Sequence, residues 1–255
     1  EFVDEHLSRL DPEYFERYDD STIAGHIAAL ASLRQGRFCR LLRRELDGGC
    51  WEITVTAYDH QGLFSIIAGA LAADGVNIYS GEVWTYSESR RSGEATARKR
   101  FEFRSSRFTP RRAEAPNTDS DEKFLRHKKI VDNFIVRTVT NEPDWDRIER
   151  RLDGLTGMLI QDRGEEARRE VNSSVVEYLS LYVKVTEQKL LPVRVEVDND
   201  SSARYTVMDI RADDTPAFLY LFTNALAMRG VDIRNIQINT CDGKVEDRFF
   251  ITDRQ

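Results

Sequence analysis

The sequence contains little cysteine and histidine, and it has no long apolar run. The three cysteines are scattered without a CxxC spacing, which is typical of a reducing compartment and not of a disulfide framework or a zinc ribbon. The four histidines stand far apart with no adjacent His-Asp pair, which argues against a metal phosphohydrolase centre. No segment approaches the ~20 apolar residues that a membrane-spanning helix needs.

Motifs for nucleotide chemistry are also absent from the sequence. We find no P-loop, no G-x-G-x-x-G and no Gly-Ser turn followed by a D-x-D pair that would hold Mg²⁺. We therefore assign no catalytic residue, metal or cofactor to this chain, and we expect Mg²⁺ only where a separate catalytic domain is present. No signal peptide opens the sequence, so we expect a cytoplasmic protein. The first residue is not Met, so we expect this chain to be part of a longer polypeptide.

The charge balance argues against general nucleic-acid binding. Lys and Arg number 37 against 44 Asp and Glu, which gives a net charge of -7, whereas nucleic-acid binding calls for a basic field. Basic residues concentrate between about 87 and 129, a segment with few bulky apolar side chains. We interpret this segment as a mobile basic insert, with contact to an acidic partner or nucleic acid as the alternative.

The main feature that the sequence does contain is an internal duplication. A shift of 155 positions (214 − 59) places "DHQGLFSIIAGALAADGVNI" on "DTPAFLYLFTNALAMRGVDI". The match runs without a gap from Asp59 and Asp214 to Thr85 and Thr240. A repeat of this length predicts two copies of one structural unit.

Each copy has the pattern of a small α+β unit. The alternating "CWEITVTAYD" and "YTVMDIRAD" predict strands, and an apolar helix that ends at Gly75 or Gly230 follows each of them. A second alternating strand and a third, at 130–138 or in "VEDRFFIT", come next. In the first copy a helical stripe then begins at Trp145. This order predicts an α+β fold of two ferredoxin-like βαββαβ modules in tandem.

The fourth strand of each module is open to two interpretations. We favour "RFCRLLRREL" and "PVRVEVDND", which precede the two copies, as edge strands of their own modules; the alternative returns Val193–Val197 to the first module. The predicted organisation is a helical segment at 1–35, a first module at 37–160 that includes the basic insert, a connecting helix at 161–191, and a second module at 192–255 that stops before its second helix.

The turn between the first strand and the helix of the first copy is the candidate ligand site. Asp59 can cap backbone N–H groups, and Gly62 lets the backbone approach a ligand closely. The N–H groups at the start of a helix attract a carboxylate, and Asn77 at the start of the next strand would add an amide. This set suits a free amino acid. The alternative is a helix cap and tight turn without a ligand.

The pattern D-x-x-G-L-F, the helix and "GVNI" resemble the ACT domain, a small regulatory module that often binds amino acids between paired copies. The tandem, with "VRVEVDND" and "VEDRFFITD", is similar to the C-terminal part of the bacterial PII uridylyltransferase/uridylyl-removing enzymes. The resemblance implies a glutamine-sensing regulatory part of such an enzyme, with the PII signalling protein as a partner of the fused catalytic domains. It also implies a homodimer through the ACT sheets.

The resemblance places the ligand contacts in the first loop and more weakly in the second. The first set is Asp59, His60, Gln61, Gly62, Leu63 and Asn77, and the second is Asp214, Thr215, Ala217, Phe218 and Asp232. Ala217 stands where the family usually carries Gly, so we expect the bulkier second loop to bind less well. The alternative function is a structural, dimerising ACT pair that binds no ligand.

Overall fold

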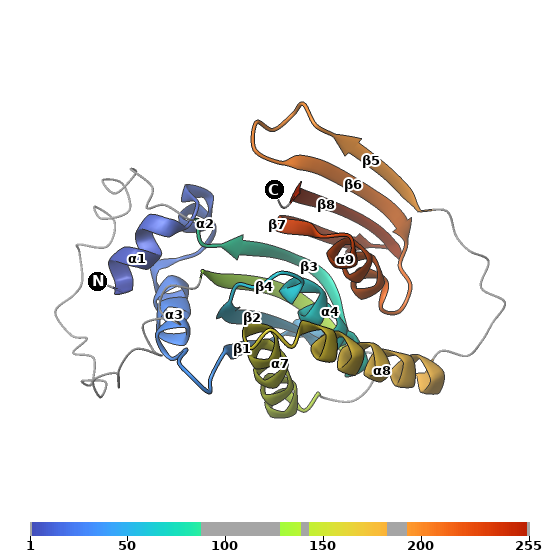
Figure 1. The fold of residues 1–255 in the computed structure, drawn as a ribbon, viewed down its shortest axis with the longest axis horizontal. Helices are drawn as coiled ribbons and strands as arrows, with labels where there is room; N and C mark the ends of the chain where they lie inside the picture. Colours follow the sequence, from blue (N-terminus) through green and yellow to red (C-terminus); the bar gives the residue numbers. More distant parts are fainter. Residues whose placement is uncertain (1, 88–127, 139–142, 183–192, 254–255) are drawn as a thin grey trace.

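The computed structural model describes residues 2–87, 128–138, 143–182 and 193–253, and the strands in these ranges form one antiparallel sheet (Figure 1). Their order across the sheet is β1-β2-β4-β3-β7-β8-β6-β5. The strands are β1 (Cys39–Leu46), β2 (Cys50–Tyr58), β3 (Val76–Thr85), β4 (Lys129–Thr138), β5 (Arg194–Asp198), β6 (Thr206–Asp213), β7 (Val231–Cys241) and β8 (Lys244–Asp253).

The sheet consists of two halves with the same topology. The order β1-β2-β4-β3 in the first half repeats as β5-β6-β8-β7 in the second. In each half the edge strand comes first in the chain and pairs with the strand that follows it, as Leu41 does with Val55 and Val195 with Ile210. The α+β fold with two ferredoxin-like modules is therefore confirmed. The alternative that returned Val193–Val197 to the first module is wrong, because β5 pairs with β6.

A local twofold axis relates the two modules. Their edges meet where β3 pairs with β7 in antiparallel fashion, and Glu82 lies opposite Gln237. These two residues are equivalent positions of the 155-residue repeat, so the axis passes between them. Gly81 is needed at this junction because a Cβ atom there would lie 2.4 Å from the Phe134 ring and 2.7 Å from the Asn133 carbonyl oxygen.

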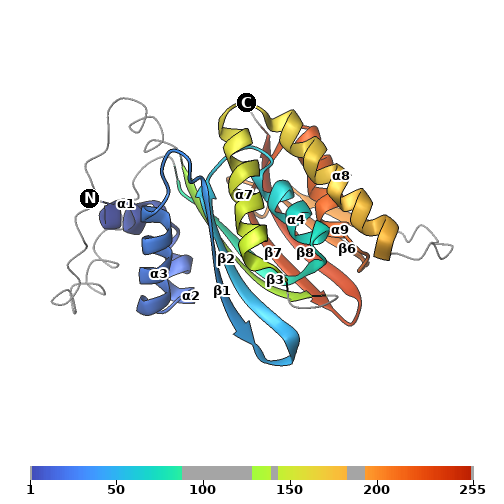
Figure 2. The same ribbon diagram turned by 90° about the horizontal axis from the view of Figure 1, so that it is seen from below.

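Helices cover both faces of the sheet, but unequally (Figure 2). One face carries α4 (Leu63–Ala73), α7 (Trp145–Ile160), α8 (Gly164–Tyr182) and α9 (Phe218–Met228). The other face, over the first module, carries α1 (Phe2–Arg9), α2 (Pro12–Arg17) and α3 (Asp20–Ala31). Strand β4 serves both layers, since Phe134 packs in the core under α4 and Val131 packs under the N-terminal helices.

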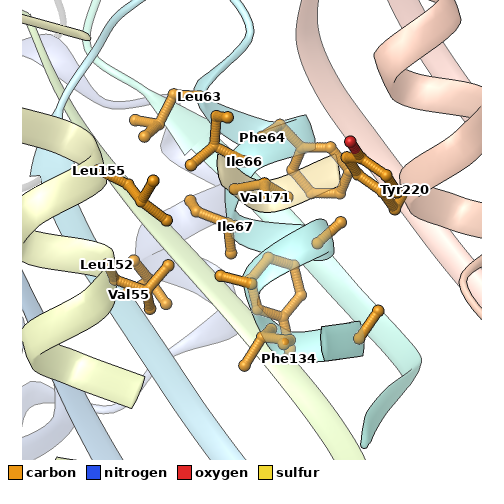
Figure 3. Close-up of a cluster of buried hydrophobic side chains, with 14 of the residues drawn as sticks. Val55, Leu63, Phe64, Ile66, Ile67, Phe134, Leu152, Leu155, Val171 and Tyr220 are labelled. Atoms are coloured by element: carbon orange, nitrogen blue, oxygen red, sulfur yellow. The ribbon is translucent and has the colours of Figure 1, made fainter. Parts of the chain in front are cut away.

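The centre of the larger core is helix α4, which is apolar on nearly all sides. It contacts α7, α8 and α9 as well as the sheet, and Figure 3 shows Ile67 of α4, Val171 of α8 and Tyr220 of α9 within one cluster of buried side chains. Each buried side chain of this size contributes about 1.5–3 kcal/mol to folding. Because α8 and α9 both pack on α4, the connecting segment and the second module hold the first helix from two sides.

The N-terminal helices are anchored through polar groups that are buried against the sheet. The Tyr86 hydroxyl lies 2.8 Å from His6 Nδ1, and the Tyr14 hydroxyl lies 2.7 Å from His26 Nδ1. Lys129 Nζ lies 3.6 Å from Glu5 Oε2. The first and third contacts join α1 to the residue after β3 and to β4, and the second joins α2 to α3, so the N-terminal segment packs as a layer on the first module.

Two further sequence expectations concern the insert and the membrane. The insert separates β3 from β4, which still pair directly, with Thr85 opposite Ile130. Its residues 88–127, including the short strand considered at "FEFR", lie outside the described residues. Among the described helices, none combines the length and the apolar character that a membrane crossing requires.

Candidate functional site

The loop between β2 and α4 is held in place by backbone hydrogen bonds. The Asp59 N–H donates to the Lys128 carbonyl oxygen at 2.8 Å, which ties the loop to the start of β4. Gly62 precedes the helix with φ 80°, in the left-handed region that favours glycine. Gly62 offers no capping side chain, so the first N–H groups of α4 have no side-chain cap.

A small cavity lies where this loop meets the second module. Its wall combines loop residues, the ends of β3 and β4, and α9 and β7 of the other module, and Gly62 lies close enough to α9 that a Cβ atom there would be 3.6 Å from that of Ala227. The lining residues are Asp59, His60, Gly62, Leu63, Phe64, Ser65, Val83, Thr85, Ile130, Asp132, Thr223, Ala227, Val231, Asp232 and Ile233. The open space is about 30 Å³, which is room for roughly two water molecules.

The cavity wall is acidic. Asp59, Asp132 and Asp232 all line it, and Asp232 is paired with Arg234 at 2.7 Å. Burial, followed by the charge of Asp232, raises the pKa of Asp59. Burial, followed by the charge of Asp59, raises the pKa of Asp132 well above its ordinary value. The cavity therefore favours neutral acids or a ligand that brings positive charge.

The second loop has the same backbone course with different contents. The Asp214 N–H donates to the Gly243 carbonyl oxygen at 2.9 Å, which matches the bond from Asp59 to the start of β4. Ala217 takes the place of Gly62 and has φ 60°, which is unfavourable for a residue with a Cβ atom. Phe218 stacks on Phe222, so aromatic side chains fill the start of α9.

The structure divides the predicted residues between two places. It brings Asp59, His60, Gly62 and Leu63 together with Asp232 in the cavity wall, and Gln61 stays in the loop, where its carbonyl accepts a hydrogen bond from His60 Nδ1 at 3.0 Å. The other predicted residues do not line this cavity: Asn77, Asp214, Thr215, Ala217 and Phe218.

The twofold axis explains this division. Asp232 is the repeat equivalent of Asn77, and an antiparallel β3-β7 contact brings the loop of one module to the strand of the other. The expectation that Asn77 lies beside the Asp59 loop assumed a site within a single module. The structure instead places Asp232 of the second module in the wall of the cavity at this loop.

Sequence reasoning did not select Asp132 or Arg234 as site residues. Asp132 lies in the middle of the apolar strand β4 and is 1% exposed. The signal was present in the repeat, because Asp247 occupies the matching position in β8 and is 3% exposed. A charged residue that recurs inside equivalent buried strands is a functional-site candidate.

The described residues offer little for covalent or metal chemistry. They contain no group of three or more His, Cys, Asp or Glu side chains placed to hold a metal ion. Burial raises the pKa of the Cys39 thiol, which opposes formation of the nucleophilic thiolate.

Comparison with known proteins gives one group of relatives. A bifunctional uridylyltransferase/uridylyl-removing enzyme of Rhodospirillum rubrum is 30% identical over 252 residues, which covers 93% of this chain and 22% of that enzyme. The corresponding enzymes of Rhodopseudomonas palustris and Bradyrhizobium diazoefficiens are 25% and 24% identical, over 79% and 98% of this chain and 17% and 22% of theirs.

No family model matches the chain, and no solved structure matches it. The chain spans about a fifth of the length of the curated relatives that it matches. Over nearly its whole length, this chain is a homologue of one part of the bifunctional uridylyltransferase/uridylyl-removing enzymes.

Proposed function

We propose that this chain is a regulatory module that binds a free amino acid, glutamine, at the junction of its two ACT-like modules. Bound glutamine would control uridylyl transfer and removal on the PII protein by catalytic domains of a longer polypeptide. The observation that carries the proposal is the cavity between the Asp59 loop of one module and α9 and β7 of the other. Its relatives' names and the resemblance to glutamine-sensing ACT pairs support the choice of ligand and reaction.

The chemistry of the cavity suits a zwitterion. Phe64 and Ser65, in the first turn of α4, line the cavity, and N–H groups at this end of a helix favour a carboxylate. The carboxyl groups of Asp59 and Asp132, which also line the cavity, favour an ammonium group. A free amino acid presents both charges at the spacing of one carbon atom, so one small ligand satisfies both walls.

The size of the cavity indicates how binding would be transmitted. A space of about 30 Å³ is too small for an amino acid, so the loop must move away from α9 to admit one. That movement separates Gly62 from Ala227, which are in close contact across the two modules. A ligand that binds only the separated arrangement shifts the population toward it, and this is the physical content of the proposed control.

The test is calorimetry and thermal unfolding of the 255-residue chain with L-glutamine and with the other common amino acids. A ligand at 100 times its Kd stabilises the folded state by about 2.7 kcal/mol, which gives a measurable rise in Tm. The matched variants are Asp59→Asn and Asp214→Asn, the same change at repeat-equivalent positions. Asp59→Asn is expected to weaken binding by about 30-fold or more, the equivalent of about 2 kcal/mol, and Asp214→Asn to leave it unchanged. Absence of heat and of any Tm rise with every amino acid would refute the proposal.

A second candidate function, a structural pair that dimerises, is favoured by the edge of the second module. Val195 and Val197 pair with Ile210 and Met208 and share their face of the sheet, yet they are 44% and 56% exposed. In the first module α7 covers the matching strands. Light scattering of the wild-type chain and of Val195→Lys tests this candidate, and a monomeric wild-type chain at high concentration would contradict it.

A further inference from the structure

A pair of acidic residues recurs in the two modules, one at the end of the first central strand and one inside the neighbouring strand. Asp59 follows β2 and Asp132 lies in β4; Asp214 follows β6 and Asp247 lies in β8. In each pair burial raises the pKa of the second residue most, and the charge of the first residue raises it further. The first pair lines the cavity between the modules.

Strand alternation places both members of the first pair on the helix-covered face. Residues that alternate with Asp132 along β4 pack in the core under α4, and so do those that precede Asp59 along β2 at the same spacing. These core residues are Ile130, Phe134 and Val136 of β4 and Ile53, Val55 and Ala57 of β2. Both residues line the cavity together with Leu63 and Phe64 at the start of α4.

The two inner acids differ in their hydrogen bonds. Asp247 Oδ1 accepts a hydrogen bond from the Asn239 N–H at 3.1 Å. At the equivalent place the Trp84 backbone N–H donates to the Asp132 carboxyl. However, Asp132 Oδ1 is fully buried and has no hydrogen-bond partner among the described residues. A buried polar atom without a partner is costly, and this one belongs to a residue that lines the cavity between the modules.

The charged groups around the first pair do not neutralise it. Asp232 and Arg234 of β7 face Asp59, but they are paired with each other at 2.7 Å. Burial and then Asp232 raise the pKa of Asp59, and the smaller opposing effects of Arg234, Lys128 and His60 leave the net shift upward.

Within the described ranges, the charged group that shifts the pKa of Asp132 is Asp59, and it acts after burial. On the β1 side lies the Cys39 thiol, whose pKa is raised by burial first and also by the charge of Asp132. The helix above contributes Ser65, and α9 contributes Thr223. The first acid pair therefore lies in a buried setting where two negative charges repel each other, which favours one shared proton in the ligand-free protein.

We propose that the Asp59–Asp132 pair receives the ammonium group of the ligand, and that this ammonium displaces the proton held by the pair. The inference rests on the proposed amino-acid binding, and it names Asp59 and Asp132 as the residues that select for an amine. On binding, R–NH₃⁺ donates hydrogen bonds to Asp132 Oδ1 and to the Asp59 carboxylate. The proton formerly held by the pair leaves to solvent, so the complex contains one ammonium and two carboxylates.

Calorimetry of the whole chain with L-glutamine at pH 7, in buffers of different ionisation enthalpy, measures the released proton directly. Roughly one proton is expected to leave per ligand bound, and the affinity is expected to rise by up to about tenfold per pH unit while the pair still holds its proton. Glutaramic acid, which is glutamine without its α-amino group, is expected to give no binding. Asp132→Asn is expected to abolish both the proton release and the pH dependence, while the matched Asp247→Asn leaves both intact.

The possible outcomes separate this inference from the proposed function. Glutamine binding with no net proton release, or with equal affinity in Asp132→Asn, would overturn the inference and leave the amino-acid site standing. Absence of binding by every amino acid would overturn both. Carboxyl-carbon NMR of the ligand-free chain provides an independent readout, since an Asp132 that is ionised at pH 5 would also refute the shared proton.

Discussion

Gly69 in α4 gives a direct test of how the two modules are held together. A Cβ atom at this position would lie 2.3 Å from Val171 Cγ1 of α8 and 2.6 Å from Tyr220 Cδ2 of α9. Both distances are far below the 3.5–4.0 Å at which carbon atoms attract each other. Val171 and Tyr220 are buried, at 0% and 1% exposure, so neither side chain can turn out to solvent. We expect Gly69→Ala to force α8 and α9 away from α4.

The magnitude follows from two opposing effects. Alanine stabilises a helix interior by about 1 kcal/mol relative to glycine. Overpacking a tight core costs about 1–3 kcal/mol. Gly154 in α7 is the matched control, because a Cβ atom there has no neighbour within 4 Å. Gly154→Ala should therefore raise the free energy of unfolding by about 1 kcal/mol, and Gly69→Ala should fall below it by about 1–3 kcal/mol.

Urea unfolding followed by circular dichroism measures both variants. The double variant Gly69→Ala, Val171→Ala should be less destabilised than the sum of the two single changes, because Val171 supplies the shortest contact. Gly69→Ala with the same stability gain as Gly154→Ala would show that α4, α8 and α9 are not packed as described.

Three further predictions concern titration and loop strain. Burial lowers the pKa of His6 to about 3 and of His26 to about 4. Both folded pKa values lie below the unfolded value of 6.5, so the free energy of unfolding is highest above pH 6.5. It should fall by about 2 kcal/mol per histidine when the pH is lowered to 5. Equal free energies of unfolding in urea at pH 7 and pH 5 would contradict this. Burial raises the pKa of Asp247 from 3.8 to about 7. A proton on Asp247 therefore stabilises the folded state fully below pH 3.8, and this stabilisation is lost as the pH rises to 7. Asp247→Asn should remove a stability loss of up to about 4 kcal/mol between pH 4 and 8, measured as a flatter pH profile. Thermal unfolding should show Gly62→Ala destabilised and Ala217→Gly stabilised, each by about 1 kcal/mol, because both positions have positive φ; shifts of the same sign would refute the strain argument.

The modules themselves could be predicted from the sequence because their signals are local. Alternation in β2 and β6, apolar spacing in α4 and α9, and the glycines that end those helices are properties of short segments. The 155-residue shift added that both copies share one fold. The edge strands β1 and β5 followed from their position just before each first strand, and their pairing confirms that choice.

The junction between the modules could not be predicted in the same way. Whether β3 meets β7, and in which register, depends on contacts such as Gly81 against Phe134 that lie far apart in the chain. The expected partner of the Asp59 loop was therefore Asn77 of the same copy, whereas the structure brings Asp232 of the other copy.

The N-terminal helices illustrate a second limit. Their helical pattern was recognisable, but the face that they cover was not. His6 and His26 looked like isolated histidines with no partner nearby in the sequence. In the structure both are buried against tyrosines, one of which, Tyr86, is 80 positions away. The tyrosine partners of these histidines can be identified only from the folded structure, because the packing of the helices on the sheet brings them together.

Covalent linkage of the two copies explains why their equivalent positions have become unequal. In a symmetric dimer of identical chains each loop would meet the same strand, so any substitution would appear in both junctions. In this chain the first junction combines Gly62, an Asp132 oxygen without a described partner, and Asp232. Equivalent positions in the second junction hold Ala217 and Asn77, and the inner acid there is satisfied by the backbone. The first junction keeps a small acidic cavity at a cost in buried polar energy, whereas the Asp247 carboxyl of the second module accepts a backbone hydrogen bond. That difference is expected if one junction is maintained for a ligand and the other for packing, which makes one ligand per chain the natural stoichiometry of the proposed sensor.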